Sequence, residues 1–352
     1  MGTRVRELIM TLPPAAFAFV MAAGIVAVGL DLVGLAAASW VLIGVAGVGY
    51  LALVVMTVVR LLRWRHLLVG DLRDPARSFG FFTFVAGTDV LGVALAEHGA
   101  YRAALVLLLI GLVAGVILGY VVPWLAALGG GPPPLRVVDG TWFVWVVAAQ
   151  SVAVLAAMLS PVFPGWTYEL ATVSVMGWSA GAVLYLAVAA LVLVRLTGQP
   201  VGPADMNQSY WITMGAMAVT IVGGSLIVGL DPGSSPMVTA SQQLISGVSV
   251  IMWCFATALI PLLVAVGFWR HIVHGIPLHY KAAQWSIVFP LGMYAVAGMQ
   301  LGRADDLPMV AAIGRGWIWV AVGAWLLTFV AMLVAVFARR RPAGVSALPS
   351  AG

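Results

Sequence analysis

The stretch "WSIVFPLG" (residues 285–292) follows a pattern that occurs five times in this chain: aromatic residues come first, and small residues follow one to two helical turns later. The other four copies are "FAFVMAAG" (17–24), "FFTFVAG" (81–87), "WFVWVVAA" (142–149) and "YWITMGA" (210–216). Counted from Phe17, Phe81, Trp142, Trp211 and Trp285, successive copies begin 64, 61, 69 and 74 residues apart. This spacing predicts five equivalent helices, each separated from the next by one further helix.

The composition places these helices in a membrane. Of 352 residues, 63% are hydrophobic and 8% are charged, and the mean hydropathy is +1.09. Soluble domains carry about 25% charged residues. The chain is therefore predicted to be an all-α integral membrane protein. The single cysteine, Cys254, excludes a disulfide within the chain, and its apolar surroundings predict a buried, inert thiol.

Ten apolar segments are long enough to cross a bilayer, which requires about 20 residues. We expect one transmembrane domain over residues 1–352, with its core at about 12–337 and short cytoplasmic tails at 1–11 and 338–352. The predicted segments are 12–30, 39–60, 79–97, 102–122, 141–159, 172–194, 209–229, 241–268, 282–300 and 316–337.

The distribution of basic residues predicts the orientation. Fourteen of the 17 Lys and Arg residues fall in the N-terminus and alternate loops, and only Arg102, Arg303 and Arg315 fall in the other loops. Positively charged loops remain in the cytoplasm. We therefore expect a multi-pass protein of the cell membrane with both termini cytoplasmic. Because the basic residues are spread over membrane-adjacent loops, the net charge of +5 does not indicate nucleic-acid binding.

The odd-numbered segments carry the aromatic-then-small pattern, whereas the even-numbered ones are plainer, as lipid-facing helices are. This difference predicts five helical hairpins inserted in the same direction. Such repeats are related by an axis along the membrane normal. A quasi-five-fold arrangement, with small residues pointing inward, would leave a central pore. The alternative is that the aromatic residues only mark the membrane interface.

Five motifs resemble those of the tellurite-resistance and dicarboxylate transporter family, which includes the plant guard-cell slow anion channels. They are the Pro-led first segment (Pro13, Pro14, then "FAFVMAAGI"), "GTWFVWVVAAQ" (140–150), "YWITMGAMA" (210–218), "FATALIPLLVAVGFWRH" (255–271) and "WSIVFPLGMY" (285–294). The resemblance implies ten helices in five hairpins around an anion pore, and a homotrimer. One departure is Met21-Ala22-Ala23-Gly24, where the family typically has Met-Gly-Thr-Gly.

The resemblance also implies that an aromatic residue of the ninth segment plugs the pore, which here is Phe289. A ring across a narrow apolar lumen excludes water, and such constrictions close channels by dewetting. Pro290 removes one helix hydrogen bond and permits a local bend. The alternative is a Pro-kinked helix in which Phe289 only fills core space.

Candidate lining residues are the small and hydroxyl-bearing positions of the odd segments, which contain no Lys or Arg in their interiors. Partial charges from hydroxyls and helix ends can supply a weak positive field. Each hydroxyl could equally bond a carbonyl of its own helix. The candidates are Gly24, Thr83, Gly87, Thr88, Gln150, Thr213, Gly215, Ser286 and Gly292.

Asp89 is a carboxylate in the middle of a segment. Inserting a charged side chain at the centre of a membrane helix costs about 2.5–3.5 kcal/mol of free energy on insertion scales, so such a group usually faces a cavity. Protonated, Asp89 could couple protons to anion movement; ionised, it would repel anions. The alternative is a neutral acid that bonds a neighbouring helix, for example at Gln150.

The sequence therefore predicts transport of a small anion, such as an inorganic anion, sulfite, an organic acid or a dicarboxylate. The alternative is a proton-coupled carrier that uses Asp89. We expect no enzyme activity, because "GWSAG" (177–181) lies in an apolar helix without an intramembrane His beside Ser179. We expect neither a cofactor nor a metal site, since the three His of "HIVHGIPLH" (271–279) have no acid or cysteine beside them.

Overall fold

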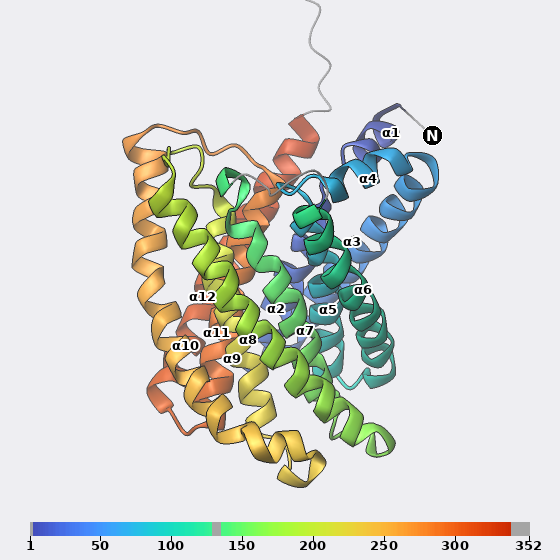
Figure 1. Ribbon diagram of the computed structural model, residues 1–352, viewed down its shortest axis with the longest axis vertical. Helices are drawn as coiled ribbons and strands as arrows, with labels where there is room; N and C mark the ends of the chain where they lie inside the picture. Colours follow the sequence, from blue (N-terminus) through green and yellow to red (C-terminus); the bar gives the residue numbers. More distant parts are fainter. Residues whose placement is uncertain (1–2, 129–134, 339–352) are drawn as a thin grey trace, which may run out of the picture.

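The computed structural model describes residues 3–128 and 135–338 (Figure 1). In these residues every regular element is a helix, and ten helices are long and apolar enough to cross a membrane, which confirms the predicted number. Residues 129–134, and all but the first residue of the predicted tail 338–352, lie outside the described part.

Five of the ten helices are inner helices. They begin with short 3-10 turns and are largely covered by protein, with 72–83% of each span buried. Their bounds are α2 (Ala18–Leu32), α5 (Phe82–Glu97), α7 (Phe143–Leu159), α9 (Trp211–Val228) and α11 (Trp285–Ala304). These are the segments with the aromatic-then-small pattern, so the pattern marks the helices that are buried.

The other five are outer helices, with only 17–28% of each span buried. Their bounds are α3 (Ala36–Arg63), α6 (Tyr101–Leu128), α8 (Thr167–Gly198), α10 (Pro236–Phe268) and α12 (Pro308–Ala338). Three of them, α8, α10 and α12, begin five to eight residues earlier than predicted, because a polar residue within the first eight positions (Glu169, Gln242 and Arg315) lowers the local hydropathy. In α10, for example, Pro236 occupies the first position and the Ser235 side chain accepts a hydrogen bond from the Met237 N–H.

The inner helices contact one another in a closed ring, in the order α2, α5, α7, α9, α11 and back to α2. Each outer helix packs against the inner helix that precedes it in the chain and against the next inner helix of the ring. The long helices consequently run side by side, as Figure 1 shows.

The 3-10 turns that precede the inner helices contact each other in the same cyclic order. They are η1 (Pro14–Phe17), η2 (Ser78–Phe81), η4 (Gly140–Trp142), η6 (Gln208–Tyr210) and η9 (Ala282–Gln284). A Cβ at Gly140 would overlap the backbone of Ser209, so these two turns touch through their backbones. All five inner helices therefore start at one end of the molecule, which we call the amino end of the ring.

Two short helices, α1 (Thr3–Met10) and α4 (Arg65–Arg73), lie together beside this end (Figure 1). A buried ion pair holds α4 to α3, because the Arg60 and Asp71 side chains approach to 2.8 Å. Arg60 also donates to the carbonyl of Leu12, and Arg77 pairs with Asp71 at 2.9 Å. These charged side chains therefore hold α4, and the segments that precede α2 and α5, against the end of α3.

Cys254 is exposed on α10, so the prediction of a buried thiol was wrong. The outer helices are apolar on the face that would meet lipid, and an apolar sequence context therefore does not distinguish lipid contact from protein core.

Glycines allow the backbones of α11 and α12 to touch. A Cβ at Gly314 would lie 2.7 Å from both the Ala295 carbonyl oxygen and the Met299 nitrogen. Small residues permit this packing in membranes, where lipid and protein are equally apolar and close van der Waals contact drives association.

This contact predicts that Gly314→Val lowers the melting temperature in detergent strongly. The added side chain must separate two backbones, and such overpacking costs about 1–3 kcal/mol or more. Gly316→Val is the matched control, because Gly316 lies on the same helix with open space around its Cα. Equal melting temperatures for the two variants would show that α11 and α12 do not pack in this way.

Candidate ion path and its closure

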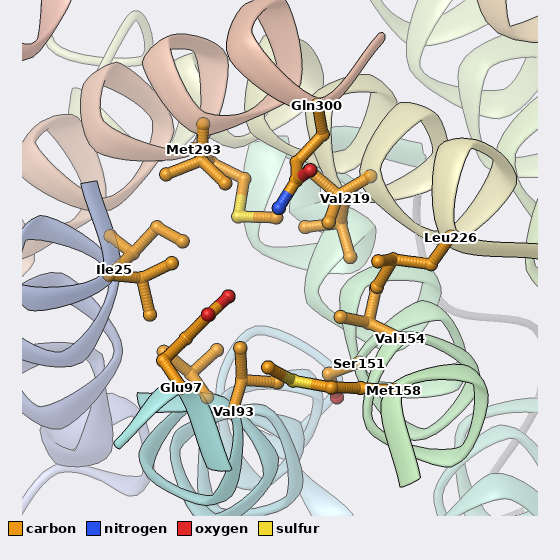
Figure 2. A pocket seen from close by; sticks show the side chains of 14 residues that line it. Ile25, Val93, Glu97, Ser151, Val154, Met158, Val219, Leu226, Met293 and Gln300 are labelled. Carbon is orange, nitrogen blue, oxygen red and sulfur yellow. The ribbon is translucent and has the colours of Figure 1, made fainter. Parts of the chain in front are cut away.

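A central cavity lies inside the ring, and all five inner helices contribute to its wall (Figure 2). The lining residues recur at three levels of each helix, three and then four positions apart, so they lie on one helical face. The first level contains Ile25, Val90, Ser151, Val219 and Met293; the second contains Val28, Val93, Val154, Val222 and Val296; the third contains Glu97, Met158, Leu226 and Gln300.

The cavity narrows from the third level to the first. The four third-level side chains are partly exposed, whereas the residues of the other two levels are buried. The space has a volume of about 20 Å³, room for roughly one water molecule. It opens at the carboxyl ends of the inner helices, which we call the carboxyl end of the ring, and it closes at the first level.

Phe289 lies one helical turn beyond the closed end of the cavity. It precedes Met293 by four residues and therefore shares the lumen-facing side of α11. The equivalent residues of the other inner helices are small or aliphatic, and the five together are Met21, Ala86, Val147, Gly215 and Phe289. Phe289 is 1% exposed. One aromatic ring among small neighbours is an arrangement that can fill the centre of the ring.

Pro290 packs against α9 at Gly215. A Cβ at Gly215 would lie 2.8 Å from Cγ of Pro290, so only glycine leaves room for the pyrrolidine ring. Helix α11 continues through Pro290, although Pro provides no N–H for the carbonyl of Ser286. The α11 backbone therefore lacks one hydrogen bond beside Phe289.

The predicted glycines lie where inner helices touch. A Cβ at Gly24 would meet Val90 of α5, and a Cβ at Gly292 would meet Ile25 of α2. Gly87 faces α2, with its Cβ position 3.3 Å from the Phe17 carbonyl oxygen. These positions bring neighbouring helices together at the lining levels and contribute backbone packing.

The hydroxyl candidates are distributed over several faces. Thr83 donates to the Gly80 and Pro14 carbonyls at the start of α5. Thr88 points outward, with its hydroxyl 3.1 Å from the Tyr50 hydroxyl of α3. Ser286 precedes Met293 by seven residues, which places it on the lumen-facing side of α11, and it is partly exposed. Thr213 is also partly exposed, but its spacing from Val219 places it on another face of α9.

Gln150 lies between three helices. Its amide nitrogen donates to the Trp178 carbonyl of α8 at 3.0 Å, and a Cβ at Gly181 or Gly223 would approach its side chain. Gly177, in the same "GWSAG" segment, lies close to the Ala149 carbonyl, with its Cβ position at 3.1 Å. The small residues of this segment thus serve packing of α8 on α7.

Asp89 occupies on α5 the position that Gln150 occupies on α7, one residue before the first lining level. Its carboxylate is fully buried and lies directly against Gly111 of α6, where any Cβ would overlap it. The Ser151 hydroxyl is 2.9 Å from Asp89 Oδ2 and 2.9 Å from the Ala148 carbonyl oxygen. A hydroxyl has one proton, so both contacts are hydrogen bonds at once only when Asp89 supplies a second. Asp89 is therefore placed behind Ser151, beside the cavity.

Two cavity residues, Glu97 and Gln300, were not among the sequence-based candidates. Both follow the first level by seven residues, and their side chains point into the cavity from α5 and α11 (Figure 2). Counting two helical turns from Val90 and Met293 would have identified them, but their position at the ends of the apolar segments suggested membrane boundaries instead.

The helix dipoles give the ring opposite polarity at its two ends. Five helix starts meet at the amino end, and each carries partial positive charge from unpaired N–H groups. One carboxylate, Asp139, accepts from one of these groups, the Thr141 N–H, and also from the Asn207 side-chain amide and the Ser209 hydroxyl. The carboxyl end carries the negative ends of the same helices, and Glu97 lies there.

A second, larger cavity of about 360 Å³ lies on the outer side of the ring. Its lining comes from α3, α4, α6 and the starts of α2 and α5, with no residue from α7, α9 or α11. It does not lie on the ring axis, and the central cavity is therefore the candidate path.

Comparison with known proteins identifies the family. Residues 11–333 match the family described as voltage-dependent anion channel. The chain belongs to the voltage-dependent anion channel family. It is 48% identical over 150 residues to an uncharacterized membrane protein of Mycobacterium tuberculosis, covering 43% of this chain and 75% of that protein. It is 25% identical over 332 residues to an uncharacterized transporter of Methanocaldococcus jannaschii, covering 92% and 93% of the two chains.

The family match confirms the resemblance noted in the sequence and shows a membrane protein of an anion channel and transporter family. The lining and gating residues were not tested by the match and stay predictions, with the positions given above.

The contact between Gly111 and Asp89 gives a testable coupling. Gly111→Ala should lower the melting temperature in detergent, because its methyl group overlaps the carboxylate. Gly115→Ala, one turn along α6, should have little effect, since its Cβ would lie 3.4 Å from Val85.

Asp89→Ser should restore most of the loss, since it removes both carboxylate oxygens and its single hydroxyl can rotate away from position 111. Residues in direct contact show coupling of about 0.5–3 kcal/mol in double-mutant cycles. Strictly additive melting-temperature changes in Gly111→Ala, Asp89→Ser and the double variant would place Asp89 elsewhere.

Proposed function

We propose that this protein conducts small anions along the axis of the five-helix ring, and that Phe289 closes the path in the conformation described here. The observation that carries the proposal is the cavity lined by all five inner helices, with Phe289 one turn beyond its closed end on the same face. Membership of an anion channel family supports the same conclusion.

The proposed path favours throughput over tight binding. Its first two levels contain ten residues, of which only Ser151 is polar, and no Lys or Arg in the described part of the chain lines the cavity. An ion must both enter readily and leave readily, which a weak field allows. The proposed substrates are small inorganic anions or organic acids, including sulfite and dicarboxylates.

The positive ends of the inner helices meet at the amino end, where the basic loops also lie. We propose that this end is cytoplasmic, with both termini on the cytoplasmic side of the cell membrane. We further propose that residues 1–352 form one transport unit without a cofactor and that three copies assemble, each with its own path.

A proton-coupled carrier that uses Asp89 remains the second candidate. The observation that favours it is the Ser151 hydroxyl, which lines the cavity and contacts Asp89 at 2.9 Å. The observation that weakens it is the position of Asp89 behind this hydroxyl. Asp89→Asn should abolish acceleration of anion uptake by an inward proton gradient if the carrier mechanism holds.

Phe289→Ala should raise chloride flux into liposomes well above that of the wild type, since truncation removes the ring and adds no favourable ion site. Phe289→Leu should raise it less, because a smaller apolar side chain still excludes water. Flux is normalised to folded protein measured by size-exclusion chromatography.

Phe143→Ala is the matched control. Phe143 is equally buried, but it packs against Tyr185 of outer helix α8 at 5.2 Å between ring centroids. Both truncations lose about 3–5 kcal/mol of packing. If Phe289→Ala and Phe143→Ala give the same normalised flux, Phe289 is a core residue and closes nothing.

The orientation is tested with a single cysteine at Arg73, which is exposed on α4, in a Cys254→Ala background. A membrane-impermeant thiol reagent should label position 73 only after the cells are opened. Labelling of intact cells would reverse the proposed orientation.

A further inference from the structure

Among the described residues that line the central cavity, Glu97 is the one ionisable side chain. It ends α5 at the carboxyl end of the ring, and its carboxylate points into the mouth opposite the amide of Gln300 (Figure 2). An anion on the ring axis must pass this group.

The charged groups around Glu97 come from two neighbouring inner helices. Asp31 of α2 and Arg303 of α11 are near enough to act on its carboxyl group. Arg303 Nη2 also donates to the Leu32 carbonyl at 3.4 Å. From α7 and α9, the residues at this level are Met158 and Leu226, which are uncharged.

His98, the next residue, is turned away from the cavity. Its Nε2 lies 2.9 Å from the Ser39 hydroxyl and 3.8 Å from Asp31, and its ring stacks on Trp40 of α3 with centroids 4.5 Å apart. The charged groups at this mouth are therefore two carboxylates, Glu97 and Asp31, and one cation, Arg303. The negative ends of five helices add to this imbalance.

We propose that Glu97 determines which anions pass and how their passage depends on pH. Ionised, it repels anions at the mouth, and it repels doubly charged anions more strongly than singly charged ones. Protonated, it leaves a mouth of neutral side chains and admits more anion. This role rests on the proposed function, because it requires that anions travel along the ring axis.

The rate of passage should therefore rise as the pH falls. Asp89 does not explain such a dependence, because it lies behind Ser151 and against Gly111, off the axis. One assay therefore distinguishes the two residues: replacing the carboxyl group of Glu97 with an amide should remove the pH dependence, and replacing that of Asp89 should not.

The test measures chloride and sulfate flux in liposomes with equal pH on both sides, in a Phe289→Ala background that keeps the path open. In this background, flux should rise as the pH is lowered from about 7.5 to about 4, where a carboxyl group of ordinary pKa, about 4, becomes half protonated. Adding Glu97→Gln should raise chloride flux at the higher pH by about tenfold, the effect of one charge a few ångström away at an intermediate dielectric constant.

The Glu97→Gln variant should also lose most of the pH dependence and increase sulfate flux more than chloride flux. Asp89→Asn and Glu169→Gln should leave the pH dependence in place. Glu169 is the matched control, since it is exposed in the first turn of outer helix α8. An unchanged pH dependence in Glu97→Gln overturns the proposal.

A second variant covers the case in which Glu97→Gln does not fold. Glu97→Cys, with Cys254→Ala, is modified by an anionic or a cationic thiol reagent. The anionic adduct should lower chloride flux and the cationic adduct should raise it, and equal effects overturn the role of Glu97. Absence of flux from every variant, including Phe289→Ala alone, contradicts the proposed function and the role of Glu97 with it.

Discussion

Close contact between neighbouring helices, made possible by small residues, is the constraint on which this structure depends. Within a bilayer, lipid and protein are equally apolar, so helices associate through close packing. At Gly24 and Gly292 a side chain would meet the next inner helix, and at Gly314 it would meet the backbone of α11. The closed order of the inner helices follows from these contacts, and the outer helices then cover the ring and face lipid.

The ring also gives its two ends opposite electrostatic character. Five helices that run in one direction gather their positive ends at the amino end and their negative ends at the carboxyl end. Asp139 partly satisfies the donors at the amino end, whereas Glu97 adds a carboxylate at the other. The proposed path is therefore asymmetric, with the apolar Phe289 level between two ends of different charge. This asymmetry comes from the direction of the repeats together with a few side chains.

The sequence alone predicted the ten spans and their division into inner and outer helices, because hydropathy and the aromatic-then-small pattern are local properties of the chain. Phe289 was assigned from the family resemblance, and its spacing from Met293 agrees with a lumen-facing position. The directions in which the Thr88 and Asp89 side chains point, toward the ring axis or away from it, could not be predicted. Adjacent helical residues differ by about 100° in direction, so a modest rotation of α5 decides whether either side chain meets the axis.

In the structure Thr88 meets Tyr50 and Asp89 meets Gly111 and Ser151. Those partners come from α3, α6 and α7, and no periodicity within α5 indicates them. Glu97 is the converse case: its seven-residue spacing from Val90 was present in the sequence, but only the closed ring shows that this face lines a cavity.

The central claim is that Phe289 closes a path on the ring axis, and the most direct test is the accessibility of Val147. This residue is 0% exposed and lies at the level of Phe289 on α7. In Cys254→Ala protein, Val147→Cys should resist a charged, water-soluble thiol reagent. It should react, and block chloride flux, once Phe289→Ala is added. Equal protection of Val147→Cys in both backgrounds, while Glu97→Cys is labelled in both, would contradict the account.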